Sequence, residues 1–334
     1  MTAHARSEDG TAHARSEDCT AHARSEDGTA HVRSETAPAP RPRVVMVDGV
    51  PMSGLVAEPD GQPRAVVVAL HGGASTAAYF DCPGHPRLSL LRLGAGLGFT
   101  MIALDRPGYG SSAPYPDAIE HPEQRVALAY GAVDAILGEK PRGAGLFVVA
   151  HSNGCELALR MAAHDRDGLI GLELAGTGLR YQDAARDILR DAGPTRRPPG
   201  LRQLLWEPAG LYPPAVLTGI TNSSTGAPYE AAMVRDWPGR DFPVVAAGVR
   251  VPVRFSHAEH ERVWCSDAES LAGIADVFTN APRFVTAEQD NAGHNLSLGV
   301  TAAAYHLKVL SFVEECVVSQ GAEQQVAEKK MEVG

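Results

Sequence analysis

The chain has 334 residues, of which 44% are hydrophobic, and its formal net charge is −10. This length and composition are typical of a globular protein that buries a sizeable core. The acidic balance argues against nucleic acid as a partner, because phosphates require a basic surface. No apolar stretch reaches the roughly 18 residues that span a membrane, and the N-terminus lacks the pattern of a secretory signal. We therefore expect a cytoplasmic protein without a membrane partner.

Residues 1–42 are predicted to be a disordered leader. Residues 2–35 repeat a polar nonapeptide, TAHARSEDG, which has almost nothing to bury. The histidines of neighbouring repeats are nine residues apart and share no compact metal site. The proline-rich sequence TAPAPRPR closes this segment and is expected to act as a stiff linker.

Residues 43–175 are predicted to form the first part of an α/β core. Two extended runs flank the turn signal Asp48-Gly49, which favours a hairpin at residues 43–58. Apolar strands are then predicted at residues 65–70, 99–105, 147–149 and 169–174, with helices at residues 88–98, 126–137 and after residue 154. Strands that alternate with helices in this way predict a mostly parallel central sheet flanked by helices on both faces.

Residues 176–250 interrupt this alternation. Prolines cluster in RRPPG, WEPAG and LYPPA, and isolated aromatic residues stand among short helical patterns. A long segment in this position is typical of a functional element rather than a connection, so we expect a helical lid over the active edge of the sheet.

Residues 251–318 are predicted to complete the core. The expected strands lie at residues 251–256 and 283–286, and the expected helices lie at residues 266–277 and 297–315. Residues 319–334 form a charged tail, which we expect to fray.

The stretch LFVVAHSNGCELALRMAA, residues 146–163, passes from a β-branched apolar run through a tight turn into a helical pattern. A serine at such a turn, here Ser152, is held above the end of a sheet with its hydroxyl exposed. The turn requires small residues two positions before and after the serine, and Ala150 and Gly154 occupy those positions. The alternative is an ordinary strand–helix loop with a coincidental serine.

A serine nucleophile needs a histidine base, and the base needs a carboxylate that orients it. His294 follows the last predicted strand, in a loop from which a base can reach the edge of the sheet. The sequence HAEHE, which follows the first strand after the insertion, offers both Glu259 and Glu261 as the acid. Only one of the two carboxylates can be placed correctly.

Four motifs occur along the chain in this order: HGG after the third strand, DRPGYGSS after the fourth, AHSNG at the turn that carries Ser152, and AGHN near the end. With these motifs in family order, and AHSNG in place of G-x-S-x-G, the chain from about residue 66 to residue 312 resembles the α/β-hydrolase superfamily. The family's H-G-x-x-D motif matches HAEHE, which places Glu261 at the acid position and leaves Glu259 as the second choice. Glutamate in place of the common aspartate, and Ala150 in place of glycine, are departures from the family pattern.

The resemblance implies an α/β-hydrolase fold with an inserted lid and a triad of Ser152, His294 and Glu261. It also implies an oxyanion hole made by the backbone N–H groups of Gly73 and Asn153. Epoxide hydrolases and haloalkane dehalogenases attack through a carboxylate, so a serine at the elbow argues against their chemistry. The five cysteines are scattered without CxxC spacing, so we expect no thiolate metal site, no other metal and no cofactor.

Three functions fit these residues. The first is a serine hydrolase that acts on a small-molecule substrate and cleaves an ester or thioester of a fairly apolar acyl group through an acyl-enzyme. The second uses the same triad as an acyltransferase or a lyase, as in a tailoring step of natural-product biosynthesis, because one fold carries several chemistries. The third is a lidded binding protein without catalysis. Competent residues at every triad position favour an enzyme, and we expect a hydrolase.

Overall fold

The computed structural model describes residues 39–164, 167–190, 198–219 and 224–333. Of the leader predicted for residues 1–42, the first 38 residues lie outside this part of the chain. The described residues form an eight-stranded sheet with the order β1-β2-β4-β3-β5-β6-β7-β8. Its strands are β1 (Arg41–Val47), β2 (Val50–Ala57), β3 (Val66–Leu70), β4 (Thr100–Leu104), β5 (Leu146–His151), β6 (Leu169–Ala175), β7 (Val253–His260) and β8 (Phe284–Gly293).

The sheet is mostly parallel, as predicted. Strand β2 runs antiparallel to both β1 and β4, and each remaining neighbouring pair is parallel. The expected hairpin at residues 43–58 is the β1–β2 pair, which turns at Asp48 and Gly49. Both turn residues have positive φ, at 47° and 82°, which is the backbone conformation that a two-residue hairpin loop requires.

Ten α-helices of the described residues surround this sheet. They are α1 (Leu90–Gly96), α2 (Pro122–Leu137), α3 (Gly154–Ala163), α4 (Asp183–Arg190), α5 (Leu201–Trp206), α6 (Pro214–Gly219), α7 (Glu230–Asp236), α8 (Phe242–Ala246), α9 (Ala268–Val277) and α10 (Ala302–Val333). Two begin at side-chain caps: Ser89 accepts the N–H of Arg92 before α1, and Asp267 accepts the N–H of Ser270 before α9.

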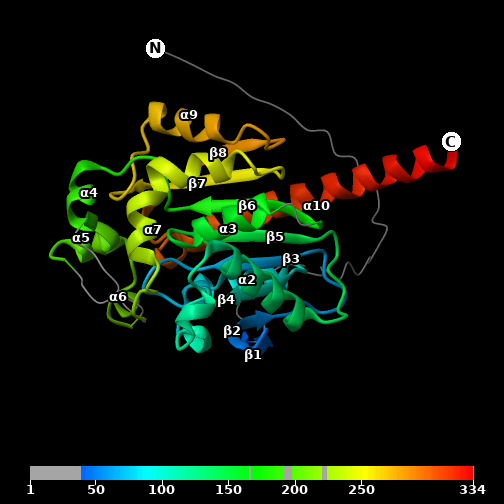
Figure 1. Cartoon of the computed structure of the whole chain (residues 1–334), viewed down its shortest axis with the longest axis horizontal. Coiled ribbons are helices and arrows are strands. Elements are labelled where there is room, and N and C mark those ends of the chain that lie inside the picture. The colour runs from blue at the N-terminus through cyan, green and yellow to red at the C-terminus, as the bar shows by residue number, and fades with distance from the viewer. Residues whose placement is uncertain (1–38, 165–166, 191–197, 220–223, 334) are drawn as a thin grey trace, which may run out of the picture. The chain divides into compact units, whose positions relative to one another are not determined.

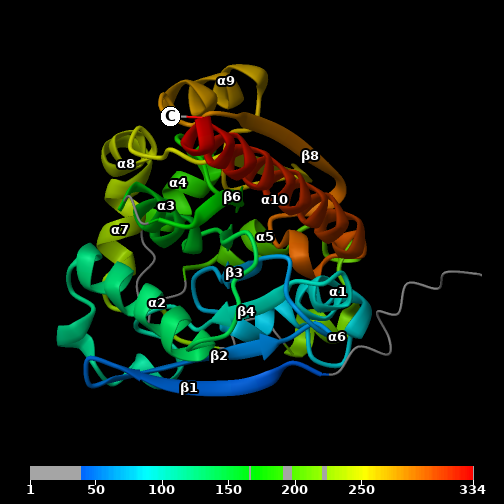
Figure 2. The same ribbon diagram turned by 90° about the vertical axis from the view of Figure 1, so that its right-hand side faces the viewer.

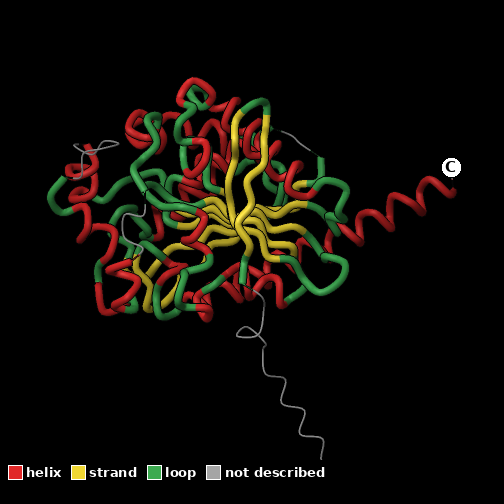
Figure 3. Tube along the Cα trace, turned by 90° about the horizontal axis from the view of Figure 1, so that it is seen from below, coloured by secondary structure: helices red, strands yellow, loops and turns green. Residues whose placement is uncertain are grey.

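Both faces of the sheet are covered, which explains why its central strands are continuous apolar runs. In β3, Val66 and Val68 pack into the core formed with α2, α3 and α8, whereas Val67 and Ala69 pack into the core formed with α1 and α10. Figure 2 shows these two groups of helices on opposite sides of the strands, and Figure 3 shows the strands between helices. Alternate residues of β3 therefore pack into two separate cores.

The insertion, residues 176–250, contributes α4 to α8 between β6 and β7. Helices α4, α5, α6 and α7 lie together at one end of the sheet, on the left of Figure 1, where the parallel strands have their carboxyl ends. Ligands of open α/β sheets bind at this end of the strands. The helices of the insertion are therefore placed at the edge where a site is expected.

Three elements extend beyond their predicted ends. Strands β7 and β8 continue as a parallel pair through His257 and Glu288, past the predicted strand ends at residues 256 and 286. Strand β6 makes its last pairing with β7 at Ser256, so beyond that residue β7 pairs with β8 alone. Only the last two residues of β7, Glu259 and His260, are not buried.

Helix α10 continues to Val333, past the expected end at residue 315 and through the tail that was expected to fray. Its residues after 318 are rich in Glu, Gln, Lys and Ala, which are good helix formers. Within the described residues, no helix is both long and apolar enough to cross a membrane.

Candidate active site

Ser152 occupies the sharp turn between β5 and α3. Its φ is 51°, in the left-handed region that a non-glycine residue adopts only when the surrounding structure enforces it. Two residues on, a Cβ built at Gly154 would lie 2.3 Å from the carbonyl oxygen of Leu70 in β3. Because only glycine permits that approach, the start of α3 lies close against β3 and the turn stays tight. This geometry is that of a nucleophile elbow.

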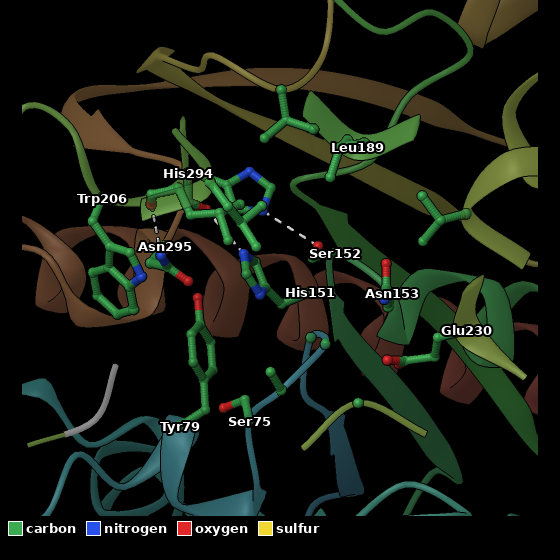
Figure 4. Close-up of a pocket in the computed structure, with 18 of the residues that line it drawn as sticks. Ser75, Tyr79, His151, Ser152, Asn153, Leu189, Trp206, Glu230, His294 and Asn295 are labelled. Atoms are coloured by element: carbon green, nitrogen blue, oxygen red, sulfur yellow. Dashed lines mark hydrogen bonds between the residues drawn. The ribbon is translucent and has the colours of Figure 1, made fainter. Parts of the chain in front are cut away.

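The structure brings Ser152, His294 and Glu261 together, as Figure 4 shows for the first two. His294 Nδ1 lies 3.0 Å from each carboxylate oxygen of Glu261, and His294 Nε2 lies 3.3 Å from Ser152 Oγ. The carboxylate accepts the Nδ1 proton, which leaves Nε2 free to accept the proton of the serine hydroxyl. The three side chains thus form a relay from carboxylate to nucleophile.

The carboxylate of Glu261 is buried and fixed by its own neighbours. Its Oε1 also accepts the backbone N–H groups of Arg262 and Val263, at 3.0 and 2.8 Å. Burial alone would raise the pKa of Glu261, but the charge of His294 and these hydrogen bonds hold that pKa below its ordinary value. Glu261 therefore stays ionised opposite the histidine.

Glu259, the second choice for the acid, has a different environment. Its side chain is 43% exposed, and its carboxylate accepts the backbone N–H of Asn291 at 2.7 Å. The contact with His294 is made by Glu261 instead. The geometry of the site thus distinguishes two candidates that the sequence left open.

Gly73 and Asn153, the two residues expected to form an oxyanion hole, lie side by side next to the serine. A Cβ built at Gly73 would lie 2.7 Å from Asn153 Nδ2, and one built at Gly72 would lie 3.1 Å from the Cβ of Ser152. Asn153 immediately precedes α3, so its N–H has no acceptor within the helix, and the helix dipole favours negative charge there. This corner of the site can stabilise an oxyanion.

His151 also belongs to the site, although the sequence assigned it no role. Its Nε2 lies 2.9 Å from the carbonyl oxygen of His294, and its ring stacks on Tyr79 with centroids 4.7 Å apart. Burial, with a smaller effect from the charge of His294, lowers the pKa of His151 to about 3. A neutral His151 therefore donates to that carbonyl and holds the backbone of the base in place. In the sequence, only its position directly before Ser152 indicated that His151 lies at the site.

A cavity of about 190 Å³ opens above these residues. Most of its wall from the insertion is apolar and consists of Tyr181, Leu189, Leu201, Leu205, Trp206, Ala231 and Val234. Polar groups gather near the loop that carries Gly73, where Ser75, Asn153 and Glu230 line the cavity (Figure 4). The cavity therefore has an apolar side formed by the insertion and a polar side next to the nucleophile. Within the described residues, no group of three or more His, Cys, Asp or Glu side chains is arranged to hold a metal ion.

The strand order, the elbow and the position of the histidine define an α/β fold with a serine at the carboxyl edge of the sheet. The model of the Alpha/beta hydrolase family matches residues 67–305, which is most of the chain. The protein belongs to the alpha/beta hydrolase family.

This chain also matches solved structures of the same fold, over almost the whole length of each. A mutant of the N-acyl homoserine lactonase AidH, complexed with N-hexanoyl homoserine, is 18% identical with a TM-score of 0.62, over 83% of this chain and 97% of that one. The thioesterase domain from the curacin biosynthetic pathway is 19% identical with a TM-score of 0.55, over 82% and 100%. Proline iminopeptidase from Mycobacterium smegmatis is 17% identical with a TM-score of 0.59, over 84% and 99%. A search of the curated proteins finds no match.

Proposed function

We propose that this protein is a serine hydrolase that cleaves an ester or thioester of a small, fairly apolar acyl substrate. The observation that carries the proposal is the continuous hydrogen-bonded series from Glu261 through His294 to Ser152, with the serine on a strained elbow at the wall of a cavity. A strained backbone at such a position is characteristic of functional sites.

The first half of the reaction makes an acyl-enzyme. Ser152 Oγ attacks the acyl carbon while its proton passes to His294 Nε2, and Glu261 stabilises the imidazolium that results. The negative charge that develops on the acyl oxygen is stabilised by the N–H groups of Gly73 and Asn153. His294 then gives its proton to the departing alcohol or thiol.

The second half releases the acid. A water molecule gives its proton to His294, its oxygen attacks the acyl carbon, and the bond to Ser152 Oγ breaks as the serine regains a proton. The resting state is restored with no further reactant. The cycle requires only the residues of the triad, the oxyanion corner and water.

The choice of substrate class is supported by the wall of the cavity. The insertion lines it with leucines and aromatic rings, which favour an apolar acyl group. Two proteins with the same fold are named for related bonds, one a thioesterase domain and one an N-acyl homoserine lactonase. Their names agree with the proposal, although at these identities the likeness shows the fold alone.

Replacement of the nucleophile tests the proposal. Ser152→Ala is expected to lower kcat for p-nitrophenyl esters and acyl thioesters by on the order of 10⁶-fold, because the residual rate depends on binding and the oxyanion hole alone. A fluorophosphonate probe should label the wild-type protein at Ser152 and leave the variant unlabelled. Unchanged turnover by Ser152→Ala would contradict the proposal.

Isotopically labelled water tests whether water is the final acceptor. Hydrolysis at the acyl carbon places the label in the released acid, whereas elimination does not, and acyl transfer gives a product that carries the acyl group on another nucleophile. Label in the acid is the expected result. An unlabelled product that still depends on Ser152 would assign the triad to one of the other two reactions.

A further inference from the structure

Glu230, the first residue of α7 in the insertion, lies in a buried polar cluster beside the nucleophile. Its Oε1 accepts a hydrogen bond from Arg106 Nη2 at 2.5 Å, and its Oε2 accepts one from the hydroxyl of Tyr109 at 2.6 Å. Arg106 and Tyr109 come from the loop after β4 and are 0% and 1% exposed. The cluster thus joins the insertion to the core at the wall of the cavity, with Arg106 and Tyr109 buried behind Glu230.

Both partners of Glu230 also hold the loop that carries Gly73. Arg106 Nη2 donates to the carbonyl oxygen of Gly72 at 3.1 Å, and the Tyr109 hydroxyl accepts the N–H of Ala74, also at 3.1 Å. These contacts fix the carbonyl before Gly73 and the N–H after it. His71 Nδ1 also lies 2.7 Å from the Gly72 carbonyl oxygen, so the loop is held by His71 together with the two side chains that Glu230 orients.

The loop needs this support because its backbone is strained. Ala74 has a φ of 52°, which costs energy for a residue with a Cβ. Arg106 is fully buried, and although burial disfavours its charge, the charge of Glu230 keeps its pKa above the ordinary value. Loss of the Glu230 carboxylate would leave a buried guanidinium charge uncompensated, and the loop would have to adjust around it.

We propose that Glu230 is a positioning residue that sets the N–H of Gly73 toward the developing oxyanion by way of Arg106 and Tyr109. The inference rests on the proposed function, because it assigns an acyl oxyanion to this corner. Packing of α7 against the core through Glu230 and the correct direction of the Gly73 N–H then depend on the same contacts. The site gains its full activity only when the insertion contacts the core through Glu230.

The expected effect is on kcat. An oxyanion donor matters most when negative charge develops, so its displacement weakens binding of the transition state more than binding of the substrate. Removal of one such donor costs about 10²- to 10³-fold in kcat in other hydrolases. Displacement of a donor should lower kcat less than its removal does. We therefore expect Glu230→Gln to lower kcat by about 10- to 100-fold, with KM changed by less than about threefold.

The matched control is Asp241→Asn. Asp241 also belongs to the insertion, but its carboxylate pairs with Arg160 of α3 at 3.3 Å and with the neighbouring Arg240 at 2.7 Å. Both substitutions exchange a carboxylate for an amide in an ion pair between the insertion and the core. The control should retain wild-type kcat and KM, so a loss confined to Glu230→Gln cannot come from loosened packing of the insertion alone.

A second measurement reports on the oxyanion directly. A trifluoromethyl ketone adds to the serine and places an oxyanion in the hole, so its affinity should fall in Glu230→Gln by the same factor as kcat. Tyr109→Phe removes the hydroxyl that links Glu230 to Ala74 and that also accepts the N–H of Ala227. It should lower kcat in the same way, and the double variant should lose less than the product of the two single losses.

The outcomes separate the two proposals. Wild-type kcat and inhibitor affinity in a folded Glu230→Gln would overturn the role of Glu230 while Ser152→Ala still shows a serine hydrolase. Activity that survives Ser152→Ala would instead overturn the proposed function. Should Glu230→Gln fail to fold, Tyr109→Phe decides alone, because unchanged inhibitor affinity in that variant would also overturn the inference.

Discussion

At the scale of single residues, the acid of the triad is the position most open to test. Glu261→Gln keeps the size of the side chain but removes the charge that favours the Nδ1–H tautomer of His294. We expect kcat to fall by roughly 10³- to 10⁴-fold, as in other triads whose carboxylate becomes an amide. Steady-state kinetics on a p-nitrophenyl ester measures this loss.

Glu259→Gln is the matched control for that experiment. Glu259 is two residues away on the same strand end, but its carboxylate contacts the backbone of Asn291 rather than the histidine. We expect less than about a threefold change in kcat, because a half-exposed hydrogen bond contributes about 1 kcal/mol or less. Equal losses in the two variants would contradict the assignment of Glu261.

The sequence predicted the residues of the relay better than it predicted their support. Ser152, His294 and Glu261 each follow a recognisable strand, and their order along the chain matches a family motif. Glu230 lies in the insertion, where no motif marks it, and it acts on the site only through contacts with residues more than 120 positions away. Such a role depends on how the chain folds back on itself, which no local pattern encodes.

At the scale of elements, the elbow depends on the close approach of α3 to β3. Gly154→Ala would place a Cβ 2.3 Å from the Leu70 carbonyl oxygen and 2.7 Å from that of His71, both of which are backbone atoms. We expect a loss of about 3 kcal/mol in the free energy of unfolding, because the strand and the helix must move apart. Urea unfolding measures this change.

Gly273→Ala provides the control within a helix. Gly273 lies inside α9, and a Cβ built there meets nothing within 4 Å. The substitution should stabilise the protein by roughly 0.5–1 kcal/mol, since alanine loses less conformational freedom in a helix. If Gly154→Ala were as stable as Gly273→Ala, the close approach would not be what holds the elbow.

Elements were predictable where local pattern and burial agree. The central strands β3, β4 and β5 are buried on both faces, and each was visible as an apolar run. The outer ends of β7 and β8 were missed because their pairing, rather than their composition, makes them strands. Pairing between distant segments is set by tertiary structure, which also decides where the insertion lies.

At the scale of the whole molecule, the two cores enclose three histidines that are buried without charge. Burial is the main cause that lowers the pKa of His71, and it lowers the pKa values of His151 and His306 to about 3. His306, on α10, lies in the interior, and among the residues that the structure describes neither of its ring nitrogens has a hydrogen-bond partner. All three resist protonation in the folded protein but accept it when unfolded.

This difference links stability to pH. Because the folded pKa values lie below the ordinary 6.5, the unfolded state binds more protons than the folded state once the pH falls below about 6.5. Stability should therefore be full above that pH and decline as the pH falls toward 4. Each such histidine contributes at most about 1.4 kcal/mol per pH unit to the decline.

His306→Leu tests this linkage, because it removes one of the three groups and also two unpartnered polar atoms from the interior. We expect the free energy of unfolding to fall less steeply between pH 6.5 and 4.5 than in the wild type. The slope should be smaller by at most about 1.4 kcal/mol per pH unit, the value for one bound proton. Urea unfolding at several pH values measures that slope. If the slope in His306→Leu equalled that of the wild type, His306 would have to be charged inside the folded protein. Burial of neutral His306 would then not contribute to loss of the fold in acid.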